Sequence, residues 1–292
     1  MRILFIGDIV GSPGVAFVRR AVPALVAAEE IDLVIANAEN AAPAGLGVTP
    51  GVYRQLRESG VDLVTLGDHI YKKADIAKVL EKDDRVCKPA NFPPDAPGKD
   101  FALAAARDGT VVAVLCLLGR TFMRPSDCPF HAADRVLAQL AGKAAVIVVD
   151  MHAEATADKY LMAHHLKGRV AAVLGSHTHV QTADEQVFPE GTAFLCDVGM
   201  TGPYDSILGR RVDRVLSTTV TFVPSPFDVA TGDVRLGGAI VDVDAATGKA
   251  TAIRRVMLDE AGLAALERRA PSAERAAPGA VESRTSAPDG NE

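Results

Sequence analysis

The segment Ala171-Ala172-Val173-Leu174-Gly175-Ser176-His177-Thr178-His179 places two histidines directly after an apolar run. The run predicts a buried strand that ends near Gly175 and is followed by a loop. Because residues i and i+2 of an extended segment point to the same side, both imidazoles can face one centre. Neutral imidazole is the commonest metal ligand among side chains, so the segment fits a metal site. The alternative is that both are loop histidines that bind nothing. The residues at the ends of the other predicted strands decide between a metal site and this alternative.

The first 70 residues contain three more apolar runs that end in polar residues. These predicted strands cover 3–6, 31–36 and 61–66, and helical patterns follow the first two of them. Such a βαβαβ rhythm predicts parallel strands joined by crossover helices. In an open α/β sheet, ligands bind in the crevice outside the carboxyl ends of the strands. The polar residues at these ends are therefore candidates for a binding site.

The rest of the chain predicts more α/β structure followed by antiparallel strands. Helices are expected at 74–80, 132–140 and 158–166, a hairpin turns at Asp108-Gly109, and strands are expected at 144–149, 192–196, 218–223, 236–243 and 250–256. We predict one domain over 1–262. Residues 270–292 are expected to be a disordered tail, because a segment so poor in large apolar residues cannot offset its chain entropy.

Polar residues at five strand ends make up the candidate site. They comprise three carboxylates and four histidines, with one neighbouring amide: Asp8, Glu39, Asp68, His69, His152, His177, His179 and Asn40. A mixed oxygen and nitrogen ligand set favours Fe, Mn or Zn over Mg or Ca. The set exceeds what one ion needs, so we expect two divalent metal ions that share a bridging carboxylate. Such a pair clamps both oxygens of an in-line phosphoryl displacement.

Each of these residues also has an ordinary structural interpretation. Asp8 could cap the following helix, Glu39 could be a solvated loop acid, and His152 could be satisfied at its strand end. For His131, His164 and His165 the structural interpretation is preferred. The stretch 7–14 lacks GxGxxG spacing and carries an acid where a pyrophosphate would approach, which argues against a dinucleotide-binding loop.

The composition of the chain restricts the classes of partner that we expect it to bind. The formal net charge of −6 argues against an extended nucleic-acid surface, although a small phosphodiester or nucleotide substrate held by a metal remains compatible. The four cysteines are scattered, which fits a reducing cytoplasm. The N-terminal apolar run is too short for a signal peptide, and no stretch is long enough for a membrane span. We therefore expect a cytoplasmic protein; a homo-oligomer is left open.

Taken together, the motifs resemble those of the YmdB-like metallophosphoesterases of the calcineurin-like superfamily. The resemblance covers about residues 1–258 and rests on six blocks: Gly-Asp-Ile-Val-Gly at 7–11, Asn-Ala-Glu-Asn at 37–40, Gly67-Asp68-His69, His152, Gly175–His179 and Asp197–Asp205. It implies a sandwich of two mixed β-sheets flanked by helices. It also implies a dinuclear site that hydrolyses phosphodiesters such as 2′,3′-cyclic nucleotides.

The resemblance assigns roles by position. One ion would bind Asp8, Glu39 and His179, and the other would bind Glu39, Asp68, His152 and His177, with Glu39 as the bridge. Asn40 and His69 would face the substrate phosphate. Two positions depart from the superfamily pattern: Val10 stands where a histidine is usual, as this branch tolerates, and Asp68 stands where an asparagine is usual.

We therefore expect a metal-dependent phosphodiesterase in which water activated by the ions attacks phosphorus in line. His69, if protonated, is expected to act as a general acid toward the leaving oxygen. Two alternatives stay open. One is a phosphomonoesterase or nucleotidase at the same site, and the other is a non-catalytic regulatory protein with a structural metal centre.

Overall fold

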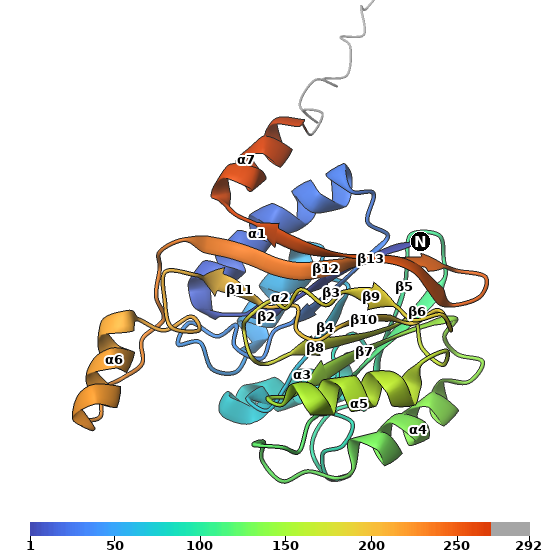
Figure 1. Ribbon diagram of the computed structural model, residues 1–292, viewed down its shortest axis with the longest axis horizontal. Coiled ribbons are helices and arrows are strands. Elements are labelled where there is room, and N and C mark those ends of the chain that lie inside the picture. The colour runs from blue at the N-terminus through green and yellow to red at the C-terminus, as the bar shows by residue number, and fades with distance from the viewer. Residues whose placement is uncertain (270–292) are drawn as a thin grey trace, which may run out of the picture.

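Two β-sheets packed face to face form the body of the protein, as expected for the α/β sandwich (Figure 1). The computed structural model describes residues 1–269. The first sheet has the strand order β2 (Asp8–Ile9), β11 (Met200–Pro203), β12 (Val234–Asp244), β1 (Arg2–Ile6), β3 (Leu33–Asn37) and β4 (Leu63–Thr65), with β13 (Lys249–Leu258) paired to β12. The second has the order β5 (Ala102–Ala105), β6 (Val111–Leu118), β7 (Val146–His152), β8 (Ala172–Ser176), β10 (Ala193–Leu195) and β9 (Gln186–Val187).

Both sheets are mixed. In the first, β1, β3 and β4 run parallel, which confirms the predicted βαβαβ rhythm. The long strand β12 runs antiparallel to them: it pairs with β11 and β1 along one edge and with β13 along the other. In the second sheet, β6, β7 and β8 are parallel, and β5 pairs with β6 as the hairpin predicted around Asp108-Gly109.

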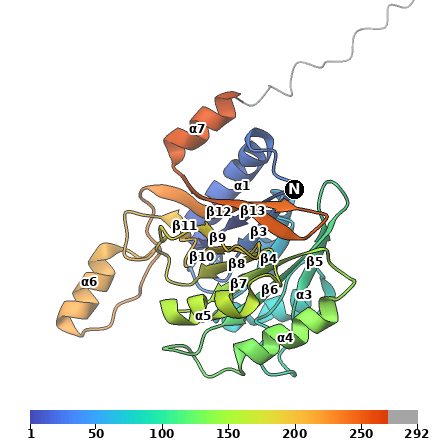
Figure 2. The same cartoon turned by 45° about the vertical axis from the view of Figure 1, so that its right-hand side comes forward.

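Helices cover the outer faces of both sheets (Figure 2). The α-helices of the described chain are α1 (Gly11–Ala28), α2 (Pro50–Glu58), α3 (Ala77–Lys82), α4 (Pro129–Leu140), α5 (Thr156–Leu166), α6 (Val212–Thr221) and α7 (Glu260–Arg269). Helix α1 lies on the first sheet, with α7 beside it, and α4 and α5 lie on the second. Short 3-10 turns, Ile70–Lys72 and Ala74–Ile76, precede α3.

Side chains that alternate along each strand divide the core into three apolar layers. In β1, Leu4 and Ile6 pack toward α1, whereas Ile3 and Phe5 pack between the two sheets. The third layer lies between the second sheet and helices α4 and α5. A strand buried on both faces reads as a continuous apolar run, which is why the sequence showed these strands so clearly.

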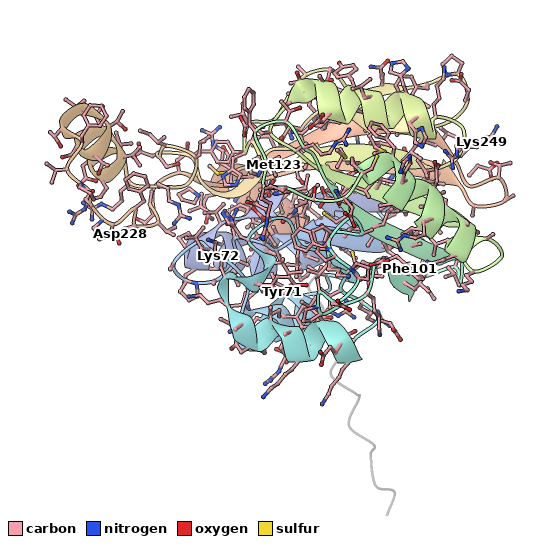
Figure 3. The ribbon with its side chains drawn as sticks, turned by 90° about the horizontal axis from the view of Figure 1, so that it is seen from below. Tyr71, Lys72, Phe101, Met123, Asp228 and Lys249 are labelled. Atoms are coloured by element: carbon pink, nitrogen blue, oxygen red, sulfur yellow. The ribbon has the colours of Figure 1, made fainter. Side chains whose placement is uncertain are left out.

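One predicted strand is wrong. Residues 218–223 were expected to be extended, but most of them belong to α6, which projects from the body together with the loop that carries Asp228 (Figure 3). The run of Val and Thr favoured a strand by composition. The i, i+4 spacing of Val212, Leu216 and Val220 is helical, and Phe222 ends the helix with a left-handed backbone at φ 59°.

Helix α7 was not predicted. Its Leu263 is buried, Glu260 and Glu267 pair with Arg20 on α1, and Asp259 accepts a hydrogen bond from the Gly262 N–H at its start. The predicted tail at 270–292 lies outside the described residues. Within residues 1–269, no helix combines the length and apolar character needed to cross a bilayer.

Candidate metal centre

Four of the predicted site residues form one tight cluster. Glu39, Asp68, His152 and His177 each offer a ligand atom, and these atoms all lie within 4.8 Å of one another. The His152 Nε2 atom is 3.2 Å from Glu39 Oε2 and 3.4 Å from Asp68 Oδ1. The predicted ligand set of one ion is thus assembled in one place, although the role of these side chains as ligands stays a prediction.

The two remaining predicted ligands lie next to this cluster. Asp8 is fully buried, its Oδ1 is 3.9 Å from His152 Nδ1, and its Oδ2 accepts a hydrogen bond from the His177 N–H. His179 Nδ1 lies 3.1 Å from the Leu208 carbonyl oxygen, which can only accept, so its Nε2 carries the lone pair. That Nε2 atom is 3.3 Å from the amide nitrogen of Asn40.

Asn40 and His69 are bonded to each other and to the cluster. The Asn40 amide donates to Glu39 Oε1 at 2.9 Å, so its oxygen faces the ring of His69, where Nδ1 lies 2.9 Å away. Because that oxygen only accepts, His69 Nδ1 must carry a proton. The backbone N–H of His69 also donates to Glu39 Oε2. The eight predicted residues therefore lie next to one another in one group, in which Asp68 approaches His152 and His177 without forming a hydrogen bond.

The two sheets contribute different kinds of ligand atoms. The carboxylates follow or lie near β1, β3 and β4 of the first sheet, and the imidazoles follow or end β7 and β8 of the second. The site is thus built where the carboxyl ends of the parallel strands of both sheets meet, as expected for this class of fold.

A buried carboxylate beneath His152 orients its ring, and sequence reasoning missed it. Asp150 is fully buried and accepts hydrogen bonds from Asn37, Thr65 and Ser176. Because the Ser176 hydroxyl donates to Asp150, it accepts from His152 Nδ1, 2.8 Å away. This leaves Nε2 of His152 facing the cluster. The alternation of polar residues at the end of β7 is the signal that could have revealed Asp150.

The loop that carries His177 and His179 has an unusual backbone. Both residues have positive φ, 95° and 66°, a conformation that non-glycine residues rarely adopt and that collects at functional sites. Thr178, between them, is held by Asp197, which accepts from its N–H at 3.1 Å and from its hydroxyl at 2.7 Å. Asp197 in turn accepts from Lys159 at 2.7 Å, and both side chains are buried. This ion pair fixes the histidine loop from below.

Replacing Asp197 with Asn is expected to destabilise the protein strongly. The change keeps the side-chain shape but leaves the Lys159 ammonium buried without a counterion, which costs on the order of 3–5 kcal/mol. Urea denaturation measures the loss. The matched control is Asp213→Asn, in an exposed pair with Arg211, which should leave the free energy of unfolding unchanged. Equal stability of Asp197→Asn and wild type would show that Lys159 does not depend on this pair.

The side chains present fit divalent metal ions. Asp8 Oδ1 and Asp68 Oδ1 are buried, and no hydrogen-bond donor within the described residues reaches them. A buried carboxylate oxygen without a partner is costly unless a cation binds it. Burial raises the pKa of the Asp8 carboxyl well above its ordinary value, which is the cost of ionising this group away from water. Mixed carboxylate and imidazole ligands are those of a transition-metal site.

The imidazoles respond to the same charges. Burial lowers the pKa of His177 to about 4, with repulsion from His152 acting in the same direction, so this ring is neutral at physiological pH and ready to ligate. For His152, burial alone would lower the pKa, but the Glu39 carboxylate and its neighbours raise it well above the ordinary value. The carboxylates thus attract positive charge to the point that His152 Nε2 faces, and a metal ion satisfies that demand.

Gly67 has no room for a side chain. A Cβ atom there would lie 2.3 Å from Glu39 Oε2 and 2.3 Å from His152 Nε2. We expect Gly67→Ala to force these two side chains apart and lower the metal content by more than half. Inductively coupled plasma mass spectrometry of the purified protein measures this. The control is Gly51→Ala on α2, where the nearest atom to the new Cβ is 3.9 Å away. Unchanged metal content in Gly67→Ala would contradict the assignment of Glu39 and His152.

A cavity of about 380 Å³ opens onto the site. Its lining includes Asn40, His69, His177 and His179 of the predicted site, together with residues of a wall around α6: Ile207, Leu208, Arg210, Val215 and Phe227. The Arg210 guanidinium donates to the carbonyl oxygens of Ala44, Gly45 and Phe227, and so ties two loops together at the rim. Sequence reasoning did not identify this wall, because it comes from the segment around α6.

Comparison with known proteins shows to which family the chain belongs. The family described as YmdB-like protein matches residues 4–256. The chain belongs to the YmdB-like family. It is 44% identical over 260 residues to a 2′,3′-cyclic-nucleotide 2′-phosphodiesterase of Bacillus subtilis (strain 168), an alignment that covers 89% of this chain and 98% of the relative. The resemblance inferred from the motifs is confirmed.

Solved structures of two relatives of this YmdB-like chain share the fold. A protein of Thermus thermophilus, described as hypothetical, superposes with a TM-score of 0.82 at 42% identity, covering 89% of this chain and 99% of that one. A structure from Mycoplasma pneumoniae, described as a novel phosphatase, superposes with a TM-score of 0.82 at 28% identity, covering 89% and 93%. The predicted sandwich class is therefore confirmed.

Proposed function

We propose that this protein is a metal-dependent phosphodiesterase that hydrolyses a small phosphodiester such as a 2′,3′-cyclic nucleotide. The observation that carries the proposal is the cluster of Glu39, Asp68, His152 and His177. It lies beside a cavity that also exposes Asn40 and His69. The Bacillus subtilis relative, named a 2′,3′-cyclic-nucleotide 2′-phosphodiesterase, supports the choice of substrate.

The proposed ligand sets are those that the family resemblance implies, and the first of them is supported by the convergence of its four ligand atoms. Glu39, Asp68, His152 and His177 would hold one ion, and Asp8, Glu39 and His179 the other, so that Glu39 bridges. This assignment gives an ion to bind to each of the two site oxygens that are buried without a hydrogen-bond partner, Asp8 Oδ1 and Asp68 Oδ1. Fe, Mn or Zn suits the mixed oxygen and nitrogen ligands. When bound, two such ions supply a water of lowered pKa and positive charge for the phosphoryl oxygens.

Asn40 and His69 would act on the substrate directly. Asn40 holds Nδ1 of His69, which orients the ring and leaves Nε2 as its second donor when the ring is protonated. Although burial alone would lower the pKa of His69, the Glu39 carboxylate raises it above its ordinary value and favours the protonated ring. His69 can then pass the Nε2 proton to the leaving ribose oxygen as a general acid.

The bond changes balance for a cyclic diester. The attacking water gives up one proton to solvent and its oxygen bonds to phosphorus, while the bond from phosphorus to one ribose oxygen breaks. That ribose oxygen takes the proton from His69, which takes up another from solvent. The leaving oxygen stays attached to the ribose, so the product is a nucleoside monophosphate. A second hydrolysis would require the monoester to bind with more negative charge.

Asp68, which stands where relatives of the wider superfamily have asparagine, should limit the rate. With Asp8 and Glu39 it places three carboxylates around the ions, and this negative charge repels an anionic phosphate. We expect Asp68→Asn to raise kcat/KM severalfold and to weaken metal binding. Steady-state kinetics at saturating metal and a metal-binding titration measure the two effects. If both stay unchanged, Asp68 does not ligate an ion.

One experiment tests the function. Purified protein with measured metal content is assayed with 2′,3′-cyclic nucleotides, 3′,5′-cyclic nucleotides and nucleoside monophosphates. We expect turnover of the 2′,3′-cyclic diester and loss of turnover after chelation. Faster hydrolysis of the monoester would favour a phosphatase instead, the activity for which the Mycoplasma pneumoniae structure is named. Full metal content with no hydrolysis of any of the three would overturn an enzymatic role and leave the regulatory alternative.

A further inference from the structure

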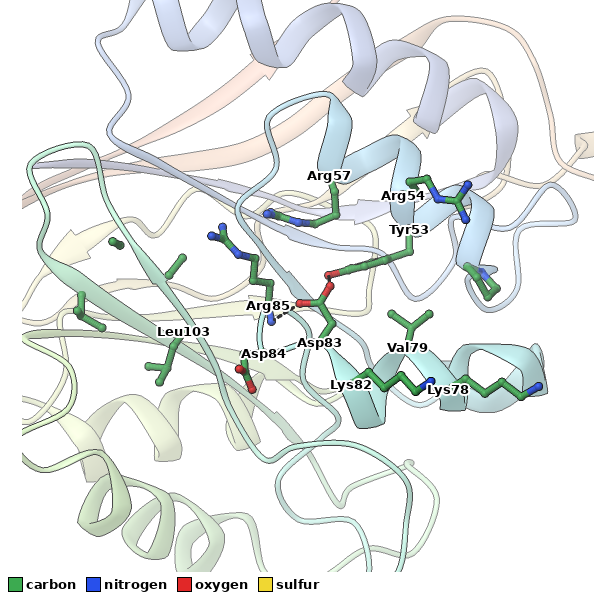
Figure 4. A pocket seen from close by; sticks show the side chains of 14 residues that line it. Tyr53, Arg54, Arg57, Lys78, Val79, Lys82, Asp83, Asp84, Arg85 and Leu103 are labelled. Atoms are coloured by element: carbon green, nitrogen blue, oxygen red, sulfur yellow. Dashed lines mark hydrogen bonds between the residues drawn. The ribbon is translucent and has the colours of Figure 1, made fainter.

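A second, larger cavity lies away from the metal centre. It has a volume of about 1020 Å³ and is formed by α2, α3, the residues after α3 and the hairpin of β5 and β6 (Figure 4). None of its lining residues also lines the cavity at the metal centre. A chamber of this size matches the upper range of small-molecule sites.

Positive charge gathers around this cavity although the whole chain is acidic. Five cationic side chains line it: Arg54 and Arg57 from α2, Lys78 and Lys82 from α3, and Arg85. The formal net charge of the protein is −6. A concentration of one sign of charge in a concave surface focuses the field and attracts ions of opposite charge.

The two acidic side chains in the lining already have hydrogen-bond or ion-pair partners. Asp83 accepts hydrogen bonds from the Tyr53 hydroxyl at 2.7 Å and from the backbone N–H of Arg85 at 2.9 Å. Asp84 pairs with Lys99, which is not among the lining residues. Among residues 1–269, no carboxylate forms an ion pair with any of the five cations of the cavity.

Two of these cations, Arg57 and Arg85, face the same part of the cavity, and neither forms an ion pair with a carboxylate of residues 1–269. Figure 4 shows the guanidinium groups of Arg57 and Arg85 extending from opposite sides toward the same part of the cavity. Arg57 is half-buried, and its hydrogen bond goes to the uncharged Val61 carbonyl. Burial lowers the pKa of Arg57 and repulsion from Arg85 acts in the same direction, although Tyr53, Asp62 and Asp83 oppose them. A pair of like charges held in this way gains from a shared anion.

We propose that the cavity binds a small organic phosphate with two or more phosphoryl groups, such as a nucleoside triphosphate. Planar guanidinium groups bind phosphate oxygens in pairs, which suits Arg57 and Arg85. A single phosphate would reach only some of the five cations, whereas a chain of phosphates reaches several. Val79, Leu103 and Val111 add apolar surface to the lining that the rest of the ligand can contact.

Calorimetric titration of the metal-loaded protein tests the proposal. The probes are a β,γ-imido analogue of adenosine triphosphate, which resists hydrolysis, inorganic triphosphate and adenosine. The analogue should bind, triphosphate should bind more weakly, and adenosine should not bind. In the double variant Lys82→Gln with Arg85→Gln, we expect the affinity for the analogue to fall by about tenfold or more, as for the loss of charge-assisted hydrogen bonds. Both side chains are exposed, so the fold should be kept.

Two further variants make the result specific. Ala105→Glu adds a negative charge at an exposed position of the lining and should weaken binding as the double variant does. Arg19→Gln with Lys249→Gln removes the same charge from exposed positions on α1 and β13 and should leave the affinity unchanged. The proposal is overturned if the analogue does not bind, if the control pair loses as much affinity, or if only Glu39→Gln abolishes binding, which would place the analogue at the metal centre.

Discussion

Glu39→Gln protein is expected to keep its fold and to lose bound metal and turnover together. Glu39 is buried, and its two oxygens face His152, His69 and the Asn40 amide. The substitution preserves the shape of the side chain but removes the charge that the proposed bridge supplies to both ions. We expect the metal content to fall from about two ions per chain to below one, and turnover to fall on the order of 10³-fold or more.

The control for Glu39→Gln is a carboxylate nearby but outside the proposed ligand set. Glu154 Oε2 lies 3.3 Å from His177 Nε2, and the side chain is half exposed. Glu154→Gln should keep both ions and most of the activity. Elemental analysis and steady-state kinetics on both variants decide the matter. Two ions per chain in active Glu39→Gln protein would rule out the bridge.

His69→Ala is expected to separate catalysis from metal binding. His69 contacts Asn40 and Glu39 from the cavity side, but it is not one of the four residues whose ligand atoms converge. Removal of a single general acid usually costs on the order of 10²–10⁴-fold in rate. We therefore expect such a loss in kcat with unchanged metal content.

A comparison of substrates sharpens the test of His69. A nitrophenol leaving group needs little protonation, so His69→Ala should lose far less rate on an activated diester such as bis-(4-nitrophenyl) phosphate than on a cyclic nucleotide. His131→Ala, outside the site, serves as the control. Loss of metal from His69→Ala would make His69 a ligand and end its assignment as an acid.

The parts of the fold that sequence predicted well are those that are buried on both faces. The apolar runs at 3–6 and 171–174 could be assigned as strands from their short, continuous apolar character and the glycine that closes each, because every residue in them packs in one of the apolar layers. The capping residue Thr49, which accepts from the Val52 N–H, is equally local. Helix α6 was mistaken for a strand because none of its residues is buried in the described chain, so composition had no packing to check it.

The candidate site also has a part that could be predicted from the sequence and a part that could not. Residues at strand ends could be brought together before the structure, because parallel strands in one sheet share a carboxyl edge. The buried residues that hold these side chains in place could not be predicted. Asp150 looks like one acid in an apolar run, and the pairing of Lys159 with Asp197 joins a helix to a loop 38 residues away. Such contacts depend on how the layers stack, which periodicity does not encode. The cavity wall around α6, which Arg210 connects to a neighbouring loop, could not be predicted from the sequence for the same reason.

The position of β12 in the first sheet has a consequence for the order of events during folding. β1 begins at Arg2 and β12 ends at Asp244, yet they are neighbours, so an N-terminal fragment that stops before Val234 leaves a long edge of β1 unpaired. Contacts so distant in sequence form slowly, and open edges invite aggregation. Asp8 and Glu39 follow β1 and β3, which pair with each other, whereas His152 and His177 end or follow strands of the second sheet, so the proposed ligands meet only when the two sheets pack together. We therefore expect metal loading at the proposed site to follow folding rather than to start it.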